Sequence, residues 1–317
     1  MSGRAARTAH QPGTHEGSSI SASVSCLSTW VVPAYAKLNL SLSVVARRAD
    51  GWHDIDSVLI PIDWHDLTGL SLAFAETDSV SLRVTGPAAD GVPTGDANLT
   101  MRAARVLPAL AGRPLALRLW LSKTVPHGAG LGGGSADAAA ILRAGTAMLA
   151  ALGVATDPGR VAAAALAIGS DIPALLEVEA HRVRGRGERI EQLSGPTLHV
   201  AVASTAPSST AATYAALLPE ELGDDGRAGR LAEVLEAGGA PDGSLLGSAL
   251  EQAACRADPA LASALQRARA VIPGVTWHLT GSGGAVFALT AGQADAERVA
   301  SAMRSAGFNA RACRTIG

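Results

Sequence analysis

The stretch that decides the fold reads KTVPHGAGLGGGSADAAA, residues 123–140. Five glycines lie within residues 128–134, and an alanine-rich segment follows that is expected to be helical, with Ser135 as its N-cap. Glycines let a backbone approach a ligand closely. The start of a helix presents unpaired N–H groups and a partial positive charge. Together these features predict a loop that binds phosphate.

Two common phosphate-binding loops fit this stretch poorly. The spacing of Gly128, Gly130 and Gly133 matches the dinucleotide fingerprint, but the strand before that loop is normally buried on both faces. Here residues 115–121 alternate between apolar and other side chains, which indicates a strand buried on one face only. The Gly-Lys-Ser/Thr ending of a P-loop is missing. Asp137 has two open interpretations, as an acid that favours the helix dipole or as a ligand that helps hold Mg²⁺.

The composition indicates a globular protein with room for two domains. Of 317 residues, 48% are hydrophobic and 17% charged, and the net charge is −2. No long basic block is present, which argues against general binding of nucleic acid. Three scattered cysteines, Cys26, Cys255 and Cys313, form neither a disulfide framework nor a zinc spacing, so a reducing cytoplasm is expected. No apolar run reaches the roughly 18 residues of a membrane span.

The order of elements predicts an α+β protein with a domain boundary near residue 195. A disordered tail is expected over 1–28, an N-terminal domain over 29–195 and a C-terminal domain over 196–317. Strands are expected at 29–42, 58–62, 115–121 and 198–202, with a hairpin at 70–84 and a strand-turn-strand at 277–289. Helices are expected at 98–110, from the glycine loop to 152, and at 158–168, 231–237, 248–255, 259–270 and 294–306.

Three motifs, in order along the chain, resemble those of the GHMP kinase superfamily. They are PAYAKLNL at 33–40, PHGAGLGGGSA at 126–136 and GSGGAVFA at 281–288. The resemblance covers about residues 31–310. It implies an N-terminal half like ribosomal protein S5 domain 2, a ferredoxin-like C-terminal half, and ATP-dependent phosphorylation of an alcohol with Mg²⁺.

Two further stretches, RRADGWHD at 47–54 and IGSDIP at 168–173, narrow the resemblance. They are similar to the members that phosphorylate the 2-hydroxyl of a methylerythritol carrying a cytidine diphosphate group, in non-mevalonate isoprenoid synthesis. Taken alone, Lys37 reads as a lysine at a strand edge and Asp171 as a turn residue. The resemblance instead makes them the catalytic pair, in which the lysine keeps the aspartate ionised as a base.

The resemblance also implies where each ligand binds. The residues implied for ATP are Asn98, Lys123, Pro126, Gly128, Gly130, Leu131, Gly132, Gly133, Gly134, Ser135, Ala136, Gly281 and Gly283. Those implied for the second substrate are Asn39, Trp52, His53 and Tyr214. Trp52 departs from the usual tyrosine, although indole also stacks on a base. A second departure is Ser248-Ala249, where the family often has Asn-Asp.

Other functions remain open at this point. One is a GHMP kinase for mevalonate, homoserine or a sugar, against which the aromatic-histidine turn at Trp52 and His53 argues. Another is a non-catalytic nucleotide- or RNA-binding module, against which Lys37, Asp171 and the near-neutral charge argue. We expect a small-molecule substrate with a cytidine diphosphate group, no nucleic-acid or membrane partner, and a monomer or weak homodimer.

Overall fold

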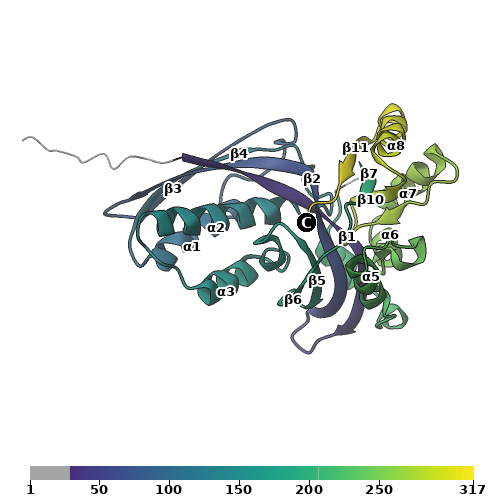
Figure 1. Cartoon of the computed structure of the whole chain (residues 1–317), viewed down its shortest axis with the longest axis horizontal. Coiled ribbons are helices and arrows are strands. Elements are labelled where there is room, and N and C mark those ends of the chain that lie inside the picture. The colour runs from purple at the N-terminus through teal and green to yellow at the C-terminus, as the bar shows by residue number, and fades with distance from the viewer. Residues whose placement is uncertain (1–28, 206) are drawn as a thin grey trace, which may run out of the picture.

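The protein is built from two β-sheets and the helices that cover them (Figure 1). This computed structural model describes residues 29–205 and 207–317. The α+β prediction is confirmed. The predicted disordered tail over 1–28, with Cys26, lies outside the described residues. Within those residues, each helix is too short or too polar to cross a bilayer.

The larger sheet is organised around a long antiparallel pair, β1 (Thr29–Arg47) and β2 (His53–Phe74). Its order is β3-β4-β2-β1-β8, and β5 and β6 extend it beside β2. The remaining strands are β3 (Ser79–Thr85), β4 (Leu115–Ser122), β5 (Ala180–Gly185), β6 (Arg189–Leu193) and β8 (Gly247–Ser248). The leucines of β4 are buried in alternation with more exposed side chains, as the sequence predicted.

The hairpin expected over 70–84 is wrong. Leu70 lies within β2, which continues to Phe74 and pairs with β4, and β3 pairs in parallel with β4 rather than with β2. The apolar pattern located both segments in strands. Their pairing depends on β4, which lies some thirty residues further along the chain, and local sequence does not report it.

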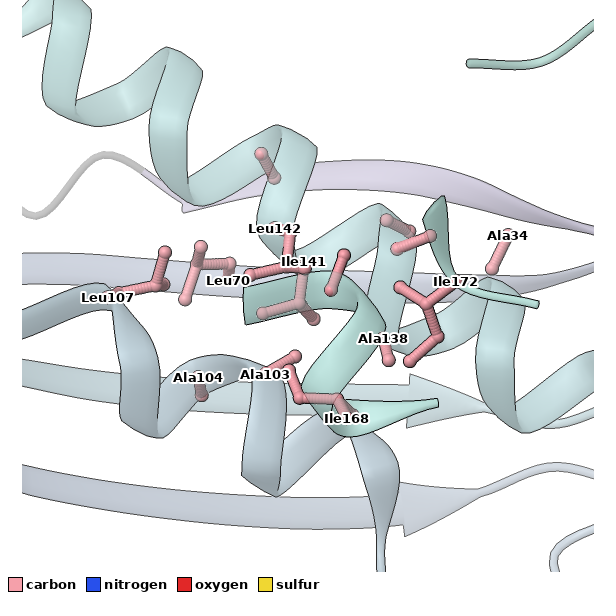
Figure 2. Close-up of a cluster of buried hydrophobic side chains, with 14 of the residues drawn as sticks. Ala34, Leu70, Ala103, Ala104, Leu107, Ala138, Ile141, Leu142, Ile168 and Ile172 are labelled. Carbon is pink, nitrogen blue, oxygen red and sulfur yellow. The ribbon is translucent and has the colours of Figure 1, made fainter. Parts of the chain in front are cut away.

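Helices α1 (Leu99–Ala111), α2 (Gly133–Ala151) and α3 (Pro158–Ile168) lie over one face of this sheet (Figure 1). Side chains between α1, α2 and the strands form an apolar core (Figure 2). The predicted starts of α1 and α3 are confirmed, since the Asn98 and Asp157 side chains cap them. The N-cap of α2 is Gly132, so the prediction of Ser135 is wrong: Ser135 is the third residue of the helix.

The smaller sheet is antiparallel with the order β11-β7-β10-β9. Its strands are β7 (His199–Ser204), β9 (His278–Leu279), β10 (Ala285–Thr290) and β11 (Asn309–Arg314). The helices of this half are α4 (Thr210–Ala215), α5 (Arg227–Glu236), α6 (Glu251–Ala257), α7 (Pro259–Val271) and α8 (Gln293–Ser305). Short 3₁₀ turns occupy Pro173–Leu175, Pro219–Glu221 and Gly243–Leu245. Strand β11 was not among the expected elements, and the helix expected at 248–255 begins at Glu251.

One apolar cluster joins the two sheets. Leu38 and Ile60 of the larger sheet pack in the same cluster as Val202 and Phe287 of the smaller one. The predicted boundary near residue 195 falls between β6 and β7, and that division stays a prediction. The packing matters for function because it holds loops from both halves around a single cleft.

Candidate active site

A cleft of about 890 Å³ opens between the two halves of the chain. The glycine loop forms one wall, β1 forms the floor, and the turn after β9 and helix α4 close the far side. Every residue implied for ATP or for the second substrate lines it except Ala136 and Gly283. Gly283 does not line the cleft, but its backbone packs against the glycine loop at Gly130. An 890 Å³ cleft is large enough for two small molecules side by side.

The glycine loop lies directly against the turn at residues 280–284. Gly130 has φ +72°, and a Cβ there would lie 2.1 Å from the carbonyl oxygen of Gly283. Gly132 has φ +67°, and the Lys37 side chain fills the space where its Cβ would be. The backbone N–H of Lys37 also donates to Leu131 O at 2.9 Å. Since Gly132 provides no side-chain cap for α2, the first N–H groups of the helix remain available to an anion.

Lys37 and Asp171 meet at the floor of the cleft. Lys37 Nζ lies 3.7 Å from Asp171 Oδ2 and donates to Asn39 Oδ1 at 2.5 Å. Lys37 is 4% exposed, whereas the Asp171 side chain is 42% exposed. The structure therefore brings together the two residues implied as catalytic, with the cation packed below and the carboxylate open to the cleft.

Asn39 shares the face of Lys37, as its position two residues further along the strand predicted. Its Nδ2 donates to Ser57 Oγ at 2.8 Å, and Ser57 Oγ donates in turn to the Ser41 carbonyl at 2.7 Å. Both polar ends of the amide are thus used within the protein. Asn39 orients Lys37, and sequence reasoning missed Ser57, which holds Asn39 in place.

The aromatic end of the cleft is built from β2 and α4. The rings of His53 and Tyr214 lie 5.0 Å apart with an interplanar angle of 36°. Tyr214 lies on α4 and is half-buried. Burial and, to a lesser extent, the charge of Arg47 lower the pKa of His53, so its imidazole is neutral near pH 7. Burial and the charge of Asp171 raise the pKa of Tyr214.

Trp52 stands beside this pair with half of its surface exposed. The guanidinium of Arg186 lies over its ring, with Cζ 4.0 Å from the ring centroid. A half-exposed indole next to a neutral imidazole is suited to a flat heterocycle, because one stacks on its face and the other can hydrogen-bond its edge.

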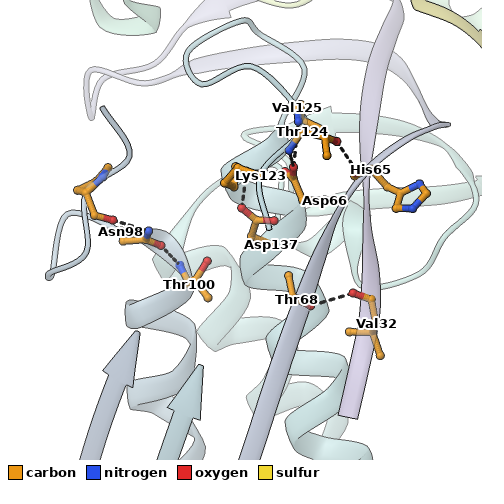
Figure 3. Close-up of polar contacts among 11 residues, drawn as sticks. Val32, His65, Asp66, Thr68, Asn98, Thr100, Lys123, Thr124, Val125 and Asp137 are labelled. Atoms are coloured by element: carbon orange, nitrogen blue, oxygen red, sulfur yellow. Dashed lines mark hydrogen bonds and ion pairs between the residues drawn. The ribbon is translucent and has the colours of Figure 1, made fainter. Parts of the chain in front are cut away.

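A buried ion cluster lies behind the glycine loop (Figure 3). Lys123 Nζ lies 2.5 Å from Asp66 Oδ2 and 2.6 Å from Asp137 Oδ2, and all three residues are almost fully buried. Asp66 Oδ1 also accepts from the backbone N–H groups of Thr124 and Val125. Asp66 was missed by sequence reasoning, because it is one of four aspartates along β2 and no motif distinguishes it from the others.

Lys123 and Asn98 were both implied as ATP contacts, but other groups of the protein already bind their polar atoms. The cleft-lining Lys123 has its ammonium between two carboxylates. Asn98 caps α1 through Thr100 N at 2.8 Å and donates to Pro93 O at 2.6 Å. Both line the cleft with their polar groups already paired. Asp137 lies beyond the first turn of α2 and binds Lys123 through Oδ2, so the predicted role at the helix dipole is wrong, while the predicted role in holding Mg²⁺ stays a prediction. Burial and the charge of Asp66, against the opposing effect of Lys123, raise its pKa to about 7.

The motif at 281–288 closes the cleft above Lys37. A Cβ on Gly281 would lie 3.1 Å from Asn39 Oδ1 and 3.4 Å from Lys37 Nζ. Ser248, which stands where asparagine was expected, donates through Oγ to the Gly281 carbonyl at 2.7 Å. The hydroxyl therefore holds this turn against the catalytic pair.

Two family models and several curated relatives match this chain. The model of the GHMP kinase N-terminal domain matches residues 98–177, and that of the GHMP kinase C-terminal domain matches residues 220–309. A 4-diphosphocytidyl-2-C-methyl-D-erythritol kinase of Cereibacter sphaeroides is 37% identical over 284 residues, covering 86% of this chain and 94% of the relative. One from a Bradyrhizobium strain is 35% identical over 287 residues, covering 86% and 91%.

A solved structure shows the same arrangement of elements. The crystal structure of a 4-(cytidine 5'-diphospho)-2C-methyl-D-erythritol kinase superposes with a TM-score of 0.73 and 33% sequence identity. The match covers 91% of this chain and all of the other chain. The fold predicted from the motifs, with its two unlike halves, is therefore confirmed.

Proposed function

The chain belongs to the GHMP kinase family, and from this premise we propose that it phosphorylates 4-diphosphocytidyl-2-C-methyl-D-erythritol at the 2-hydroxyl, with ATP as the donor. Such a kinase would serve isoprenoid precursor synthesis. The observation that carries the proposal is a single cleft in which the Lys37–Asp171 pair stands between the glycine loop and an aromatic end. The glycine loop is suited to a triphosphate, and the aromatic end is suited to a base.

In the proposed reaction, Asp171 accepts the proton of the acceptor hydroxyl. The hydroxyl oxygen then bonds to the γ-phosphorus, the bond to the β,γ-bridging oxygen breaks, and ADP leaves with that electron pair. Lys37 offsets the negative charge that develops on the transferred group, and Asn39 keeps the ammonium in place. The N–H groups at the start of α2 bind the phosphates. Positioning and charge stabilisation supply most of the catalysis in this class of reaction.

For ATP, we propose contacts along the glycine loop from Pro126 to Ala136, with Asn98 and Lys123 behind it and Gly281 and Gly283 opposite. For the second substrate, we propose Trp52, His53 and Tyr214 around the cytosine. Asn39 serves the methylerythritol end through Lys37. The pairing of Asn98 and Lys123 with protein groups favours contact through their packed surfaces over a direct hydrogen bond.

Magnesium is proposed as the companion of ATP. Among residues 29–205 and 207–317, no group of three or more His, Cys, Asp or Glu side chains is placed to hold a metal ion. Magnesium at such sites takes one or two protein ligands, with water and phosphate oxygens completing the shell. The Ser135 hydroxyl, at the start of α2 in the cleft, is suited to that limited role. When bound, the ion neutralises phosphate charge.

One assay tests the function against its alternatives. Purified protein is given ATP with 4-diphosphocytidyl-2-C-methyl-D-erythritol, mevalonate or homoserine, and ADP release is followed. Turnover with the first acceptor alone is expected. Turnover with mevalonate or homoserine instead would assign the protein to another branch of the family. Nucleotide binding without turnover on any acceptor would favour a binding module.

A further inference from the structure

An arginine at the aromatic end of the cleft has no role in the reaction as described so far. Arg186 lies in the tight turn between β5 and β6 and lines the cleft with Trp52 and Asp171. Its guanidinium covers one face of the Trp52 ring at 4.0 Å. A base that stacks on Trp52 therefore occupies the other face of the indole. The indole ring then lies between the base and the guanidinium.

Arg186 has no carboxylate within ion-pair distance among the described residues, and its charge only contributes to lowering the pKa of the exposed Asp50. The Nε of Arg186 is buried with no hydrogen-bond partner among these residues. The adjacent acid, Glu188, accepts instead from the backbone N–H of Arg186 at 2.6 Å. Its neighbours differ, since Arg182 pairs with Asp56 at 2.7 Å and Arg184 with Glu191 at 3.3 Å. Arg186 therefore lines the cleft with a charge that no ion pair within the protein engages, and such a charge can bind an anionic ligand.

The turn that carries Arg186 is fixed against the catalytic loop. Gly187 has φ +119°, and a Cβ there would lie 2.4 Å from the carbonyl oxygen of Ser170. Ser170 immediately precedes Asp171. Arg186 therefore lines the same cleft as the base-binding Trp52 and the catalytic Asp171, in a turn that packs against the catalytic loop.

The two lysines of the cleft are less available. Lys37 is bound to Asn39 and Asp171, and Lys123 lies between two carboxylates. Arg47 also lines the cleft, at the exposed end of β1, and differs from Arg186 in having no contact with the Trp52 ring among the described residues. A diphosphate between the methylerythritol and the cytidine would carry its negative charge into this space. Guanidinium groups bind phosphate oxygens in a planar, bidentate geometry that lysine does not match.

We propose that Arg186 binds the diphosphate of the cytidine-bearing substrate. The inference rests on the proposed function, because it takes its ligand from that substrate. It makes Arg186 a specificity-determining residue that recognises the link between the two ends of the molecule. ATP phosphates, which lie at the glycine loop, are not its ligand.

The test compares two probes that differ only in the diphosphate. Binding of CDP and of cytidine is measured by calorimetry for the wild type, Arg186→Gln and Arg186→Lys. Arg184→Gln, which removes a charge from β5 two residues away and outside the cleft, is the matched control. We expect Arg186→Gln to weaken CDP binding by about 10- to 100-fold and to leave cytidine binding unchanged. Arg186→Lys should lose less, and Arg184→Gln nothing.

Steady-state kinetics separate the remaining outcomes. Arg186→Gln should raise the KM for the cytidine-bearing substrate and leave kcat and the KM for ATP unchanged. Equal losses of CDP and cytidine binding would overturn the inference, because Arg186 would then act only by supporting the indole. So would a fall in kcat with intact CDP binding, which would place the charge on the transferred phosphoryl group. A wild type without CDP binding or turnover would instead overturn the proposed function, and this inference with it.

Discussion

Lys37 Nζ lies 3.7 Å from Oδ2 of Asp171. This is the distance of an ion pair without a hydrogen bond, so the charge of the lysine acts on the carboxylate while its donors point elsewhere. The lysine side chain is packed and that of the aspartate is open to the cleft. The oxygens of the carboxylate are free to accept from a hydroxyl.

Asp171→Asn should lower kcat by about 10²- to 10⁴-fold, because the amide cannot accept the proton of the acceptor hydroxyl. The substitution preserves shape, so the Kd for ATP is expected to stay near that of the wild type. Single-turnover kinetics measure the rate of phosphoryl transfer, and a binding experiment on the same sample measures the Kd for ATP. A variant with almost full kcat would remove Asp171 from the role of base.

Trp52→Ala should raise the KM for the cytidine-bearing substrate and spare the KM for ATP. Stacking of a base on an aromatic ring is worth about 1–3 kcal/mol, which corresponds to roughly 5- to 140-fold in KM when KM reflects binding. Trp52→Phe retains a ring and should recover most of this loss. If both Michaelis constants rose together, the indole would be stabilising the cleft as a whole and stacking would be refuted.

Local chemistry explains which elements could be predicted from the sequence. The starts of α1 and α3 were predictable because Asn98 and Asp157 cap their helices within a few residues. At α2 the same reasoning selected Ser135, the first residue with a capping side chain. The true cap, Gly132, has none, and its carbonyl accepts from Ala136 N through backbone geometry alone. A helix that begins in a glycine-rich segment therefore has no side-chain signal in the sequence for its first residue.

The candidate site also contains residues that the sequence could predict and residues that it could not. Lys37, Asp171 and the glycine loop carry motifs that point to their chemistry. Asp66 has no such motif, since its role arises only because Leu67 lies opposite Ser122, which brings the acid beside Lys123. Arg186 likewise depends on the contact between Gly187 and Ser170. Strand register and loop packing are set by the whole chain, so sequence pattern could not assign these residues.

Lys123→Met should destabilise the fold strongly. It would leave Asp66 and Asp137 buried without a counter-ion, and breaking a buried pair from one side costs about 3–5 kcal/mol. Chemical denaturation with urea measures the free energy of unfolding. Arg184→Met, which removes one partner of an exposed ion pair with Glu191, is the control and should cost less than about 1 kcal/mol. Similar losses in the two variants would show that the buried cluster contributes no more than a surface pair.

Asp137 should make stability fall as the pH rises from about 4 to about 7. Burial, reinforced by the charge of Asp66, raises its pKa to about 7 in the folded chain, whereas an unfolded aspartate titrates near 3.9. The folded state thus binds the proton more tightly. The stabilisation from this proton is present in full below the unfolded pKa and is lost as the pH rises through the folded pKa.

Unfolding of the wild type and Asp137→Asn, measured across this range, isolates the effect, because all other titrating groups are common to both. The wild type should lose stability relative to the variant as the pH increases. A difference that stays constant, or that grows in favour of the wild type, would mean that Lys123 holds Asp137 ionised throughout.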